Sequence, residues 1–374
     1  MAFGKKNKHG FLTKVLMFVN ALFALLLLLS YLSALVKPTI FWPMVFMGMA
    51  YPIFLWINVI FVLFWLVFSW RLSLMSILVI ILGYSHLFNY ISFGNPNKAI
   101  DPEIDYVKVL SYNVRNFDFF SSKSINSPYF ENRNNIFDFL QKEDFDIICF
   151  QEYFQDNSGR FKTTDSLTKL LRAKNIHFEY SKSRNRRLFF GVATYSAYPI
   201  LHKGRIDYPT QAGNIGIFTD ILFNKDTIRI YNLHLESIGL SKEDLLLFDN
   251  AIKSGHNIED IDFSVGIKRI TRRIRNAAIN RTVQAKLISE HIANCPYPII
   301  LAGDFNDTPF SYAYRQVSKN LNDAFKRGRR IGGNTHIWKY PSFRIDFLLY
   351  SDHFYGLNFK TGKQKYSDHY PISA

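Results

Sequence analysis

The first hundred residues of the chain contain no Asp or Glu, and this stretch constrains the fold more than any other feature. Three long apolar runs fill it, at about residues 11–36, 44–69 and 72–93. A helix needs about 20 apolar residues to cross a bilayer, and each run reaches that length. A buried core of a soluble domain is the alternative, but three acid-free runs of this kind are rare in soluble proteins. The sequence therefore predicts a membrane anchor, residues 1–94, with three transmembrane helices.

The charges that flank the apolar runs predict an orientation. A signal peptide is excluded, because the first run is too long and further runs follow it. The positive-inside rule places the lysine-rich start in the cytoplasm, since the first connection carries only Lys37. Three crossings then predict a multi-pass protein of the cytoplasmic membrane with an extracytoplasmic C-terminal domain. A re-entrant second run would instead leave that domain in the cytoplasm. The lysines at the start are Lys5, Lys6, Lys8 and Lys14.

The remainder of the chain has the composition of a globular domain. Residues 95–105, with two Xaa-Pro pairs, read as a linker. Residues 106–374 are numerous enough for one domain with a full core. From residue 101 on, 38 basic residues stand against 30 acidic ones, and this charge of +8 favours an anionic substrate or surface. The two cysteines imply neither a disulfide framework nor a cysteine metal site.

Short apolar runs in this part alternate with helical patterns, which predicts a mixed α/β fold whose core is two apolar sheets. Strands are expected at residues 107–112, 146–150, 189–195, 217–223, 227–235, 299–302 and 343–350. Helices are expected at residues 133–141, 167–174 and 272–293.

Three motifs near the end of the chain carry the chemistry. They are Gly303-Asp304-Phe305-Asn306, Arg344-Ile345-Asp346-Phe347 and Ser367-Asp368-His369. Each places a carboxylate beside an amide or imidazole next to an apolar run, and strand ends are where rigid scaffolds expose catalytic groups. Several acids, an Asn and a His that converge on one pocket suit metal-assisted attack of water on phosphorus.

Three earlier motifs complete a series. They are Leu110-Ser111-Tyr112-Asn113-Val114, Cys149-Phe150-Gln151-Glu152 and Tyr231-Asn232-Leu233-His234-Leu235. In this order the motifs resemble the endonuclease/exonuclease/phosphatase superfamily, which includes exonuclease III and DNase I-like enzymes, across residues 106–374. The resemblance implies a four-layer α/β sandwich of two mainly antiparallel sheets flanked by helices. The apolar runs resemble those of membrane-tethered bacterial members.

The resemblance also implies a metal site. Glu152 corresponds to the principal metal carboxylate, Asn113 lies beside it, and Asp368 completes the other side. Oxygen ligands of this kind suit a hard divalent cation, so the expected cofactor is Mg²⁺ or Mn²⁺.

The remaining motif residues correspond to groups that act on the phosphate. Asp304 would activate the attacking water, and Asn306 would position water and phosphate. His369 would contact the phosphate, oriented by Asp346, and His234 would donate to a non-bridging oxygen. Taken singly, Asn113 is more often a turn former and His234 more often a hydrogen-bonded core histidine.

Two departures from the family pattern bear on the substrate. Repair endonucleases usually carry an acid where this chain has Arg115, and they often carry Tyr in place of His234. Both differences point away from abasic-site repair and toward the DNase I-like and sphingomyelinase-like branches. We therefore expect a membrane-anchored phosphodiesterase with a phosphodiester or phospholipid-type substrate. A nuclease acting on DNA or RNA is the alternative within the class. A catalytically inactive scaffold is the alternative outside it, although the complete acid set argues against that.

Other segments have weaker signals. Basic clusters at residues 182–187, 268–281 and 326–330 suit phosphate backbones or lipid headgroups, and equally suit a solvated face. The stretch 237–281 is long for a connection, and its patch Leu245-Leu246-Leu247-Phe248 is expected to dock on the domain or on the membrane. Asn214 is expected to line the pocket. Nothing in the sequence sets an oligomeric state.

Overall fold

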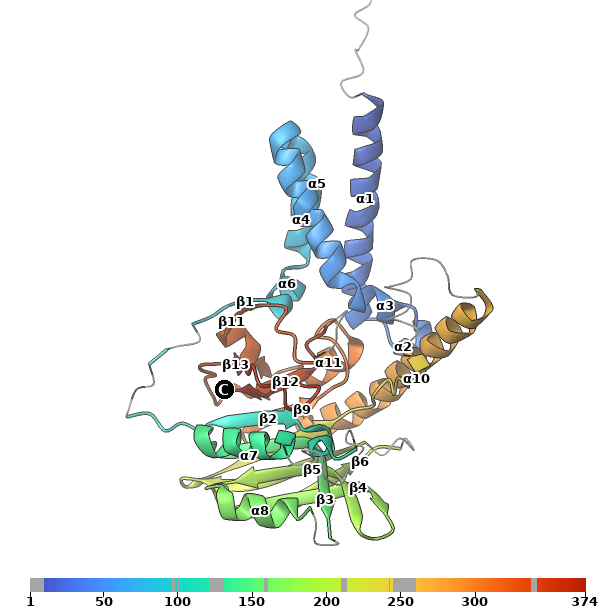
Figure 1. The fold of residues 1–374 in the computed structure, drawn as a ribbon. Helices are drawn as coiled ribbons and strands as arrows, with labels where there is room; N and C mark the ends of the chain where they lie inside the picture. The colour runs from blue at the N-terminus through green and yellow to red at the C-terminus, as the bar shows by residue number, and fades with distance from the viewer. Residues whose placement is uncertain are drawn as a thin grey trace, which may run out of the picture.

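The structure, a computed structural model, consists of a helical unit that projects from an α/β sandwich (Figure 1). It describes residues 10–95, 98–99, 101, 103–120, 131–157, 161–209, 214–241, 243–244, 260–337 and 342–374. Of the predicted features, Lys5, Lys6, Lys8 and the patch of residues 245–248 lie outside the described residues.

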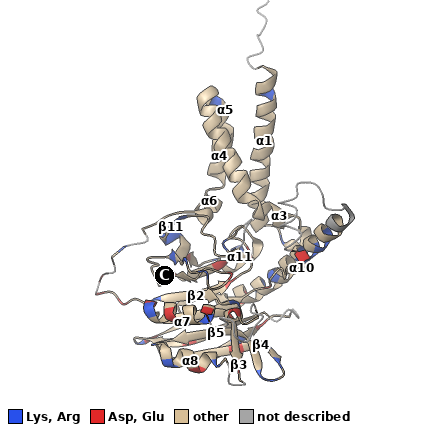
Figure 2. Ribbon diagram, viewed as in Figure 1, with Lys and Arg blue, Asp and Glu red and all other residues tan. Residues whose placement is uncertain are grey.

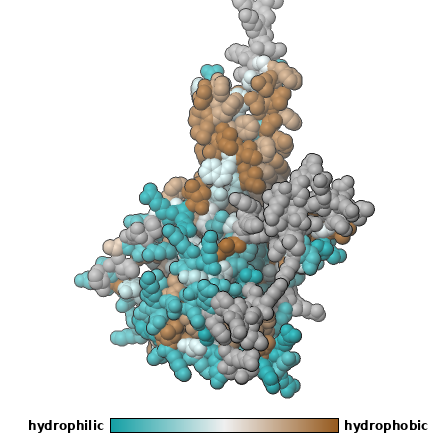
Figure 3. Space-filling model, in the orientation of Figure 1, coloured by the Kyte–Doolittle hydropathy of each residue, from teal (hydrophilic) through white to brown (hydrophobic). Residues whose placement is uncertain are grey.

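The helical unit is built around three long helices that lie beside one another: α1 (Phe11–Tyr31), α4 (Tyr51–Phe68) and α5 (Trp70–Leu82). Its apolar surface stands above the hydrophilic sandwich (Figure 3). Two stretches are long and apolar enough to cross a membrane, Phe11–Ala34 and Tyr51–Phe68. Short elements link them: the 3₁₀ turn η1 (Leu32–Ala34), α2 (Pro38–Phe41) and α3 (Met44–Met49).

The third predicted span, residues 72–93, is a bent pair of helices in the structure, and it stays a possible crossing if the pair is one span. Helix α5 ends at Leu82, and α6 (Tyr84–Tyr90) follows at an angle of 74°. Gly83 forms the joint, where an added Cβ would lie 2.1 Å from the Tyr31 ring. Residues Ile91–Phe93 then form strand β1, which pairs with β11 (Arg329–Ile331) of the sandwich. The second predicted span is likewise shortened, since α3 is a separate helix.

A buried polar network joins the three long helices. The side-chain amide of Asn20 in α1 donates to Ser76 Oγ in α5 at 2.6 Å, and Ser76 donates to Asn58 Oδ1 in α4 at 2.9 Å. Trp65 Nε1 donates to Asn20 Oδ1 at 2.9 Å. Interhelical hydrogen bonds of this kind hold apolar helices together where the hydrophobic effect does not.

The sandwich contains two six-stranded sheets, with the strand orders β13-β14-β2-β3-β5-β4 and β10-β12-β9-β8-β7-β6. The first sheet comprises β2 (Val109–Asn113), β3 (Ile147–Asp156), β4 (Asn175–Arg184), β5 (Leu188–Ser196), β13 (Lys360–Thr361) and β14 (Ile372–Ser373). The second comprises β6 (Ile200–Asp207), β7 (Ile215–Phe223), β8 (Asp226–His234), β9 (Ile299–Asp304), β10 (Asn322–Asp323) and β12 (Asp346–Tyr350). The pairs β2–β3 and β8–β9 are parallel and the other pairs antiparallel.

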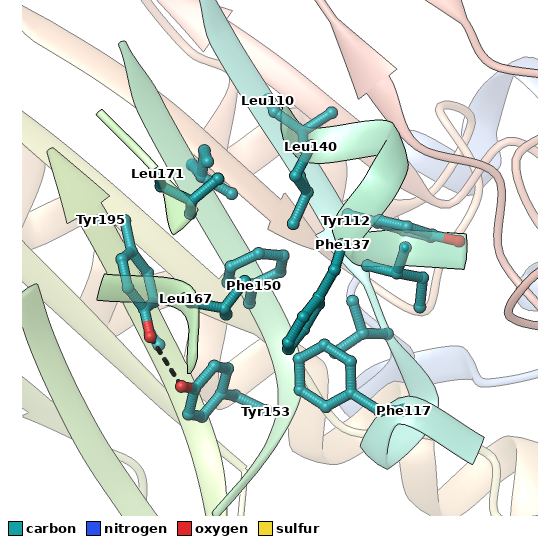
Figure 4. Packing of buried hydrophobic residues seen from close by; sticks show 14 of the residues in the cluster. Leu110, Tyr112, Phe117, Phe137, Leu140, Phe150, Tyr153, Leu167, Leu171 and Tyr195 are labelled. Atoms are coloured by element: carbon teal, nitrogen blue, oxygen red, sulfur yellow. Dashed lines mark hydrogen bonds between the residues drawn. The ribbon is translucent and has the colours of Figure 1, made fainter. Parts of the chain in front are cut away.

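Helices cover the outer face of each sheet, which confirms the predicted four-layer arrangement. Helices α7 (Glu131–Glu143) and α8 (Thr163–Leu170) pack on the first sheet through a core rich in aromatic rings (Figure 4). Helices α10 (Asp260–Ala293) and α11 (Tyr312–Val317) cover the second sheet. A third apolar cluster fills the space between the two sheets. Cys149 lies in this inter-sheet cluster, as expected of a small buried hydrophobe.

Several predicted elements differ from the structure in extent. Helix α8 begins at residue 163 and ends at 170, whereas residues 167–174 were expected. Helix α10 begins well before the predicted residue 272, and β12 begins at Asp346 instead of 343. The edge strands β4 and β6 were not predicted, because their exposed faces are too polar to show an apolar run.

Candidate active site

Strand alternation places the predicted site residues at one edge of the inter-sheet space. In β9 the side chains of Ile300 and Ala302 enter the inter-sheet cluster, and Asp304 is the next residue on that face. The same period of two carries β8 from Ile230 to His234. The parallel and antiparallel pairings bring these strand ends together, with Asp304 opposite His234 and Asp346 in the register. Asn113 ends β2, whose first residue, Val109, lies in the same cluster.

Two of the site residues have strained backbones. Glu152 has a φ of 49°, and it lies at a register shift between Phe150 and Tyr153 where β3 bulges away from β5. Asn306 has a φ of 51°. Left-handed backbone at non-glycine residues costs free energy and persists where the surrounding structure enforces it, often at functional sites. Because of the bulge, the side chain of Glu152 does not follow the in-and-out alternation of side chains along β3.

Asn113 connects the two principal carboxylates. Its Nδ2 donates to Asp304 Oδ2 at 2.9 Å and to Glu152 Oε1 at 3.2 Å. Its Oδ1 accepts from the backbone N–H of Arg115 at 3.0 Å, which fixes the orientation of the amide. Ser367 Oγ donates to the Asn113 carbonyl at 2.8 Å and ties the last motif to the first.

Asn306 folds back onto the same carboxylate. Its backbone N–H donates to Asp304 Oδ1 at 2.8 Å, and its side-chain amide donates to Asp304 Oδ2 at 3.2 Å. That amide also donates to the Leu235 carbonyl at 3.1 Å, an acceptor it shares with Asn214 Nδ2 at 2.8 Å. Asn214 thus borders the site. Its neighbour Gly213 lies outside the described residues.

His369 and Asp346 form a buried pair. Nδ1 of His369 lies 2.9 Å from Asp346 Oδ2, which confirms the predicted contact, and Nε2 lies 3.8 Å from Asp304 Oδ2. Burial lowers the pKa of the imidazole, but the Asp346 and Asp304 carboxylates outweigh this effect and raise the pKa of His369 to about 10. The ring is therefore charged at neutral pH.

His234 faces the two carboxylates from the neighbouring strand. Its Nε2 lies 3.7 Å from Asp304 Oδ2 and 3.9 Å from Glu152 Oε1. This atom is buried and has no hydrogen-bond partner within the part of the chain that the structure describes. Burial lowers the pKa of His234, more than the Asp304 carboxylate raises it. The site therefore holds an unsatisfied donor or acceptor directed at the carboxylates.

Burial also raises the pKa of both principal carboxyl groups. For Glu152 the charge of Asp368 adds to desolvation, and for Asp304 the charge of Asp346 does. Each pKa is held down in part by Asn113 and the nearby histidines. Desolvated carboxyl groups that repel neighbouring acids are the kind of environment that a bound cation stabilises.

Asp368 differs from the other predicted metal ligands. Its Oδ2 lies 3.3 Å from Arg115 Nε, and about a third of its side chain (35%) is exposed. Arg115 begins the 3₁₀ turn η2 (Arg115–Asp118), whose four residues all have positive φ, between 45° and 59°. This chain thus has a guanidinium paired with the partly exposed carboxylate of Asp368.

Two residues at the site were not found by sequence reasoning. Thr335 Oγ1 accepts from the backbone N–H of Asp346 at 3.1 Å, and the ring of His336 lies 5.0 Å from that of His369. A single β-bridge between His336 and His369 brings this segment to the site. No strand or motif marks these residues, so no sequence signal was available.

Two buried polar side chains, Gln151 and Asn232, lie beneath the site. Gln151 Nε2 donates to Asn232 Oδ1 at 2.8 Å, and Asn232 Nδ2 donates to the Ala193 carbonyl at 3.0 Å. Both side chains are fully buried. They form a hydrogen-bonded layer between the apolar inter-sheet cluster and the carboxylates.

Some basic residues of the cluster on α10 form ion pairs within the protein, and others are exposed. Arg281 is buried, and it binds Asp307 at 2.9 Å and the Glu236 carbonyl at 2.8 Å, so it is structural. Arg269 and Arg273 bind Asp244 at 2.6 Å and 3.4 Å. Lys268, Arg272 and Arg275 are exposed.

The donor set at the site suits a divalent cation. Glu152 and Asp368 offer carboxylate oxygen atoms, as the predicted metal site requires. Asn113 directs its Nδ2 at Glu152 and Asp304 in this structure, so its amide has to turn over before Oδ1 can serve as a ligand. Among the described residues, the acid and histidine atoms grouped most closely belong to Asp304, Asp346 and His369, within 4.8 Å of one another. Because His369 Nδ1 is already hydrogen-bonded to Asp346, we interpret this second group as a relay of hydrogen-bonded side chains instead of the cation site.

Comparison with known proteins gives matches to both parts of the chain. The family model described as "Endonuclease/Exonuclease/phosphatase family" matches residues 110–369, and a domain of unknown function (DUF8431) matches residues 13–90. No curated protein matches the chain.

Solved structures are similar to this chain at low sequence identity. An endonuclease/exonuclease/phosphatase from Beutenbergia cavernae is 15% identical with a TM-score of 0.50, covering 71% of this chain and 70% of its own. The catalytic domain of human Nocturnin is 16% identical with a TM-score of 0.47, covering 71% and 91%. A mannosyl-6-phosphatase from Bacteroides thetaiotaomicron is 17% identical with a TM-score of 0.46, covering 72% and 98%.

The family match spans more than half of the chain and includes every strand-end motif described above. The chain therefore belongs to the endonuclease/exonuclease/phosphatase family, whose members are metal-dependent phosphoester hydrolases.

Proposed function

We propose that this chain is a membrane-anchored phosphodiesterase that hydrolyses its substrate by attack of water on phosphorus. The observation that carries the proposal is the buried Nε2 of His234, which has no partner among the described residues and points between Asp304 and Glu152. A neutral imidazole N–H at this point can donate to a non-bridging phosphate oxygen, where negative charge builds up in the transition state.

Asp304 is the proposed base. Asn113 and Asn306 hold its carboxylate in place, and burial raises its pKa toward the range in which a carboxylate accepts a proton from water effectively. His369, charged and held by Asp346, lies next to Asp304 and is placed to bind a phosphate oxygen. These residues supply proton transfer and charge stabilisation from rigid strand ends.

Glu152, Asp368 and, once its amide has turned so that Oδ1 faces Glu152, Asn113 would hold the metal ion, Mg²⁺ or Mn²⁺. When bound, it would polarise the phosphate oxygens as a Lewis acid. Of these three residues, Glu152 is the proposed principal ligand, because the carboxylate of Asp368 already pairs with Arg115.

The helical unit supports membrane anchoring. Its helices are nearly free of charge, and Figure 2 shows basic residues at the end remote from the sandwich. Lys14 lies in the first turn of α1 and Arg71 at the start of α5, and both of these elements begin at that remote end (Figure 1). The positive-inside rule then favours a cytoplasmic remote end and an extracytoplasmic hydrolase. A phosphodiester or phospholipid-type substrate at the membrane surface fits this placement.

A hydrolysis screen tests the proposal. The purified full-length protein would be assayed with phospholipids, DNA, RNA and small phosphodiesters and monoesters, each with Mg²⁺, Mn²⁺ or a chelator. We expect metal-dependent cleavage of a phosphodiester, reduced at least ~10²-fold in Asp304→Asn. Preferential cleavage of nucleic acid would favour the nuclease alternative. Equal activity of Asp304→Asn and wild type, or no metal-dependent hydrolysis of any substrate, would contradict the proposal.

A further inference from the structure

The segment that follows Asp304 leaves the active site and ends inside the helical unit. Phe310, six residues later, is only 3% exposed. Its ring packs against Tyr51 of α4 with the ring centroids 4.2 Å apart, and it stacks with His86 of α6 at 6.1 Å. Phe310 and Tyr51 belong to one apolar cluster with Leu27 of α1. The segment that follows Asp304 is thus held by Phe310, whose side chain lies in the apolar core of the helical unit.

Hydrogen bonds fix the backbone of the same segment. Ser33 Oγ, from η1, donates to the Phe310 carbonyl at 2.7 Å, and Asn89 Nδ2, from α6, donates to the Pro309 carbonyl at 3.4 Å. Gly48 in α3 closes over this joint, since an added Cβ would lie 2.8 Å from Ser33 Oγ and 3.2 Å from the Phe310 carbonyl oxygen. Residues of η1, α3, α4 and α6 therefore lie directly against the segment.

The strand that carries Asp346 is attached to the same point. Arg344, two residues earlier, is buried, and its Nη2 donates to the Asn89 carbonyl at 3.1 Å. Asn89 therefore binds both catalytic segments, one through its side chain and one through its backbone. Asp346 and Asp304 are direct partners in the antiparallel pair β9–β12. The two strand ends thus share one attachment to the helical unit.

We propose that the membrane anchor is a positioning element of the active site, and that its packing sets the catalytic rate. The inference rests on the proposed function in one respect, because it takes Asp304 as the base. Phe310, Ser33 and Asn89 are the positioning residues, and none of them touches substrate. A misplacement of about 1 Å at a reacting group can lower the rate about 10²-fold, so a loosened joint lowers turnover even though every catalytic residue remains. The hydrolase would accordingly respond to the state of its own transmembrane helices.

The test uses the full chain in lipid nanodiscs with Mg²⁺ and bis(p-nitrophenyl) phosphate, a soluble probe that needs no membrane. We expect Phe310→Ala to lower kcat about 10- to 10²-fold with little change in KM, Ser33→Ala to lower it several-fold, and Phe310→Leu to restore most of the loss. The matched control is Phe64→Ala, which removes a half-buried aromatic from α4 roughly 20 Å along the helix from Tyr51 and leaves the buried polar network of the three long helices in place. It should leave kcat unchanged.

A second measurement does not depend on activity. Amide hydrogen exchange of residues 304–311 should accelerate in Phe310→Ala and Ser33→Ala but not in Phe64→Ala. Wild-type kcat and wild-type exchange in Phe310→Ala would overturn the inference, as would equal effects of Phe64→Ala and Phe310→Ala. If the wild type fails to cleave the probe and the substrates of the screen, the proposed function fails, and the exchange experiment alone decides the positioning role.

Discussion

Nδ1 of His369 lies 2.9 Å from Oδ2 of Asp346, and this contact joins the last two motifs of the chain. The other ring nitrogen points toward Asp304, 3.8 Å away. The carboxylate therefore fixes both the orientation and the charge of the imidazole, and the imidazole in turn borders the proposed base. Loss of either partner leaves the other buried without its hydrogen bond.

Asp346→Asn should separate orientation from charge. The amide can keep a hydrogen bond to the ring but cannot stabilise the imidazolium, so we expect kcat to fall about 10²-fold with the fold intact. Asp352→Asn is the control, because Asp352 is exposed just beyond the other end of β12. Steady-state kinetics of both variants with a soluble phosphodiester check the prediction. Comparable kcat values for Asp346→Asn and Asp352→Asn would contradict the role of the pair.

Glu152→Gln and Asp368→Asn should differ in their effect on metal dependence. Within the described residues, the ion-pair partner of Glu152 is His234 at 3.9 Å, whereas Asp368 is paired with Arg115 at 3.3 Å. We expect Glu152→Gln to raise the Mg²⁺ concentration for half-maximal activity by at least ~10-fold, and Asp368→Asn to raise it less. Mg²⁺ titrations of activity, supported by calorimetric titration of the metal alone, measure this. A larger shift for Asp368→Asn would reverse the assignment of the principal ligand.

The parts of the site that lie on regular strands could be predicted from sequence. The apolar run before Asp304 placed that carboxylate at a strand end, and the ordered motifs supplied the rest. Glu152 illustrates the limit, because it lies inside β3 at a bulge and not after a strand, and a bulge leaves no simple sequence pattern. His336 reaches the site through one bridge to His369, a long-range contact that no local pattern encodes.

The helical unit shows a second limit. The acid-free composition identified it, but composition does not show where a helix bends. At the bend, the ring of Tyr31 occupies the space that a Cβ of residue 83 would need, so the close approach requires glycine. The attachment of Phe310 to Tyr51 likewise joins residues far apart in the chain. Sequence periodicity shows which face of a helix or strand is apolar. It does not show which elements pack together, and these two contacts depend on that packing.

Acidification should destabilise the sandwich through His177. This buried imidazole lies 2.8 Å from Thr219 Oγ1, and burial, aided by Lys203 and His202, lowers the pKa of His177 to about 4. The unfolded chain binds a proton near pH 6.5 whereas the folded protein does not, so stability is lost as the pH falls from about 6.5 to 4 and is fully present above that window. The loss at pH 5 relative to pH 7 is about 2 kcal/mol.

Thermal unfolding of the detergent-solubilised protein between pH 7 and pH 5 measures this effect. The decrease in Tm should be smaller in His177→Gln than in the wild type. His353→Gln, at an exposed position, should follow the wild type. Parallel Tm curves for the wild type and His177→Gln would show that His177 does not titrate in this way.

Reporter fusions test the orientation in the membrane. Helices α1, α4 and α5 run away from, toward and again away from the remote end, so the start of α1 and the sandwich lie at opposite ends of the helical unit (Figure 1). Helix α5 has 13 residues and is only about 20 Å long, which is shorter than the hydrocarbon core of a bilayer. A third crossing therefore needs α6 as well as α5 to reach the opposite side of the membrane. With Lys14 and Arg71 at the remote end, we expect the hydrolase to be extracytoplasmic.

Alkaline phosphatase fused after Ala374 should therefore be active, and a fluorescent protein exported unfolded at the same point should be dark. Fusions after Phe68, in the α4–α5 turn, should show the reverse pattern and serve as the internal control. A bright fusion and an inactive phosphatase after Ala374 would place the hydrolase in the cytoplasm, where intracellular nucleic acid becomes the first substrate to examine.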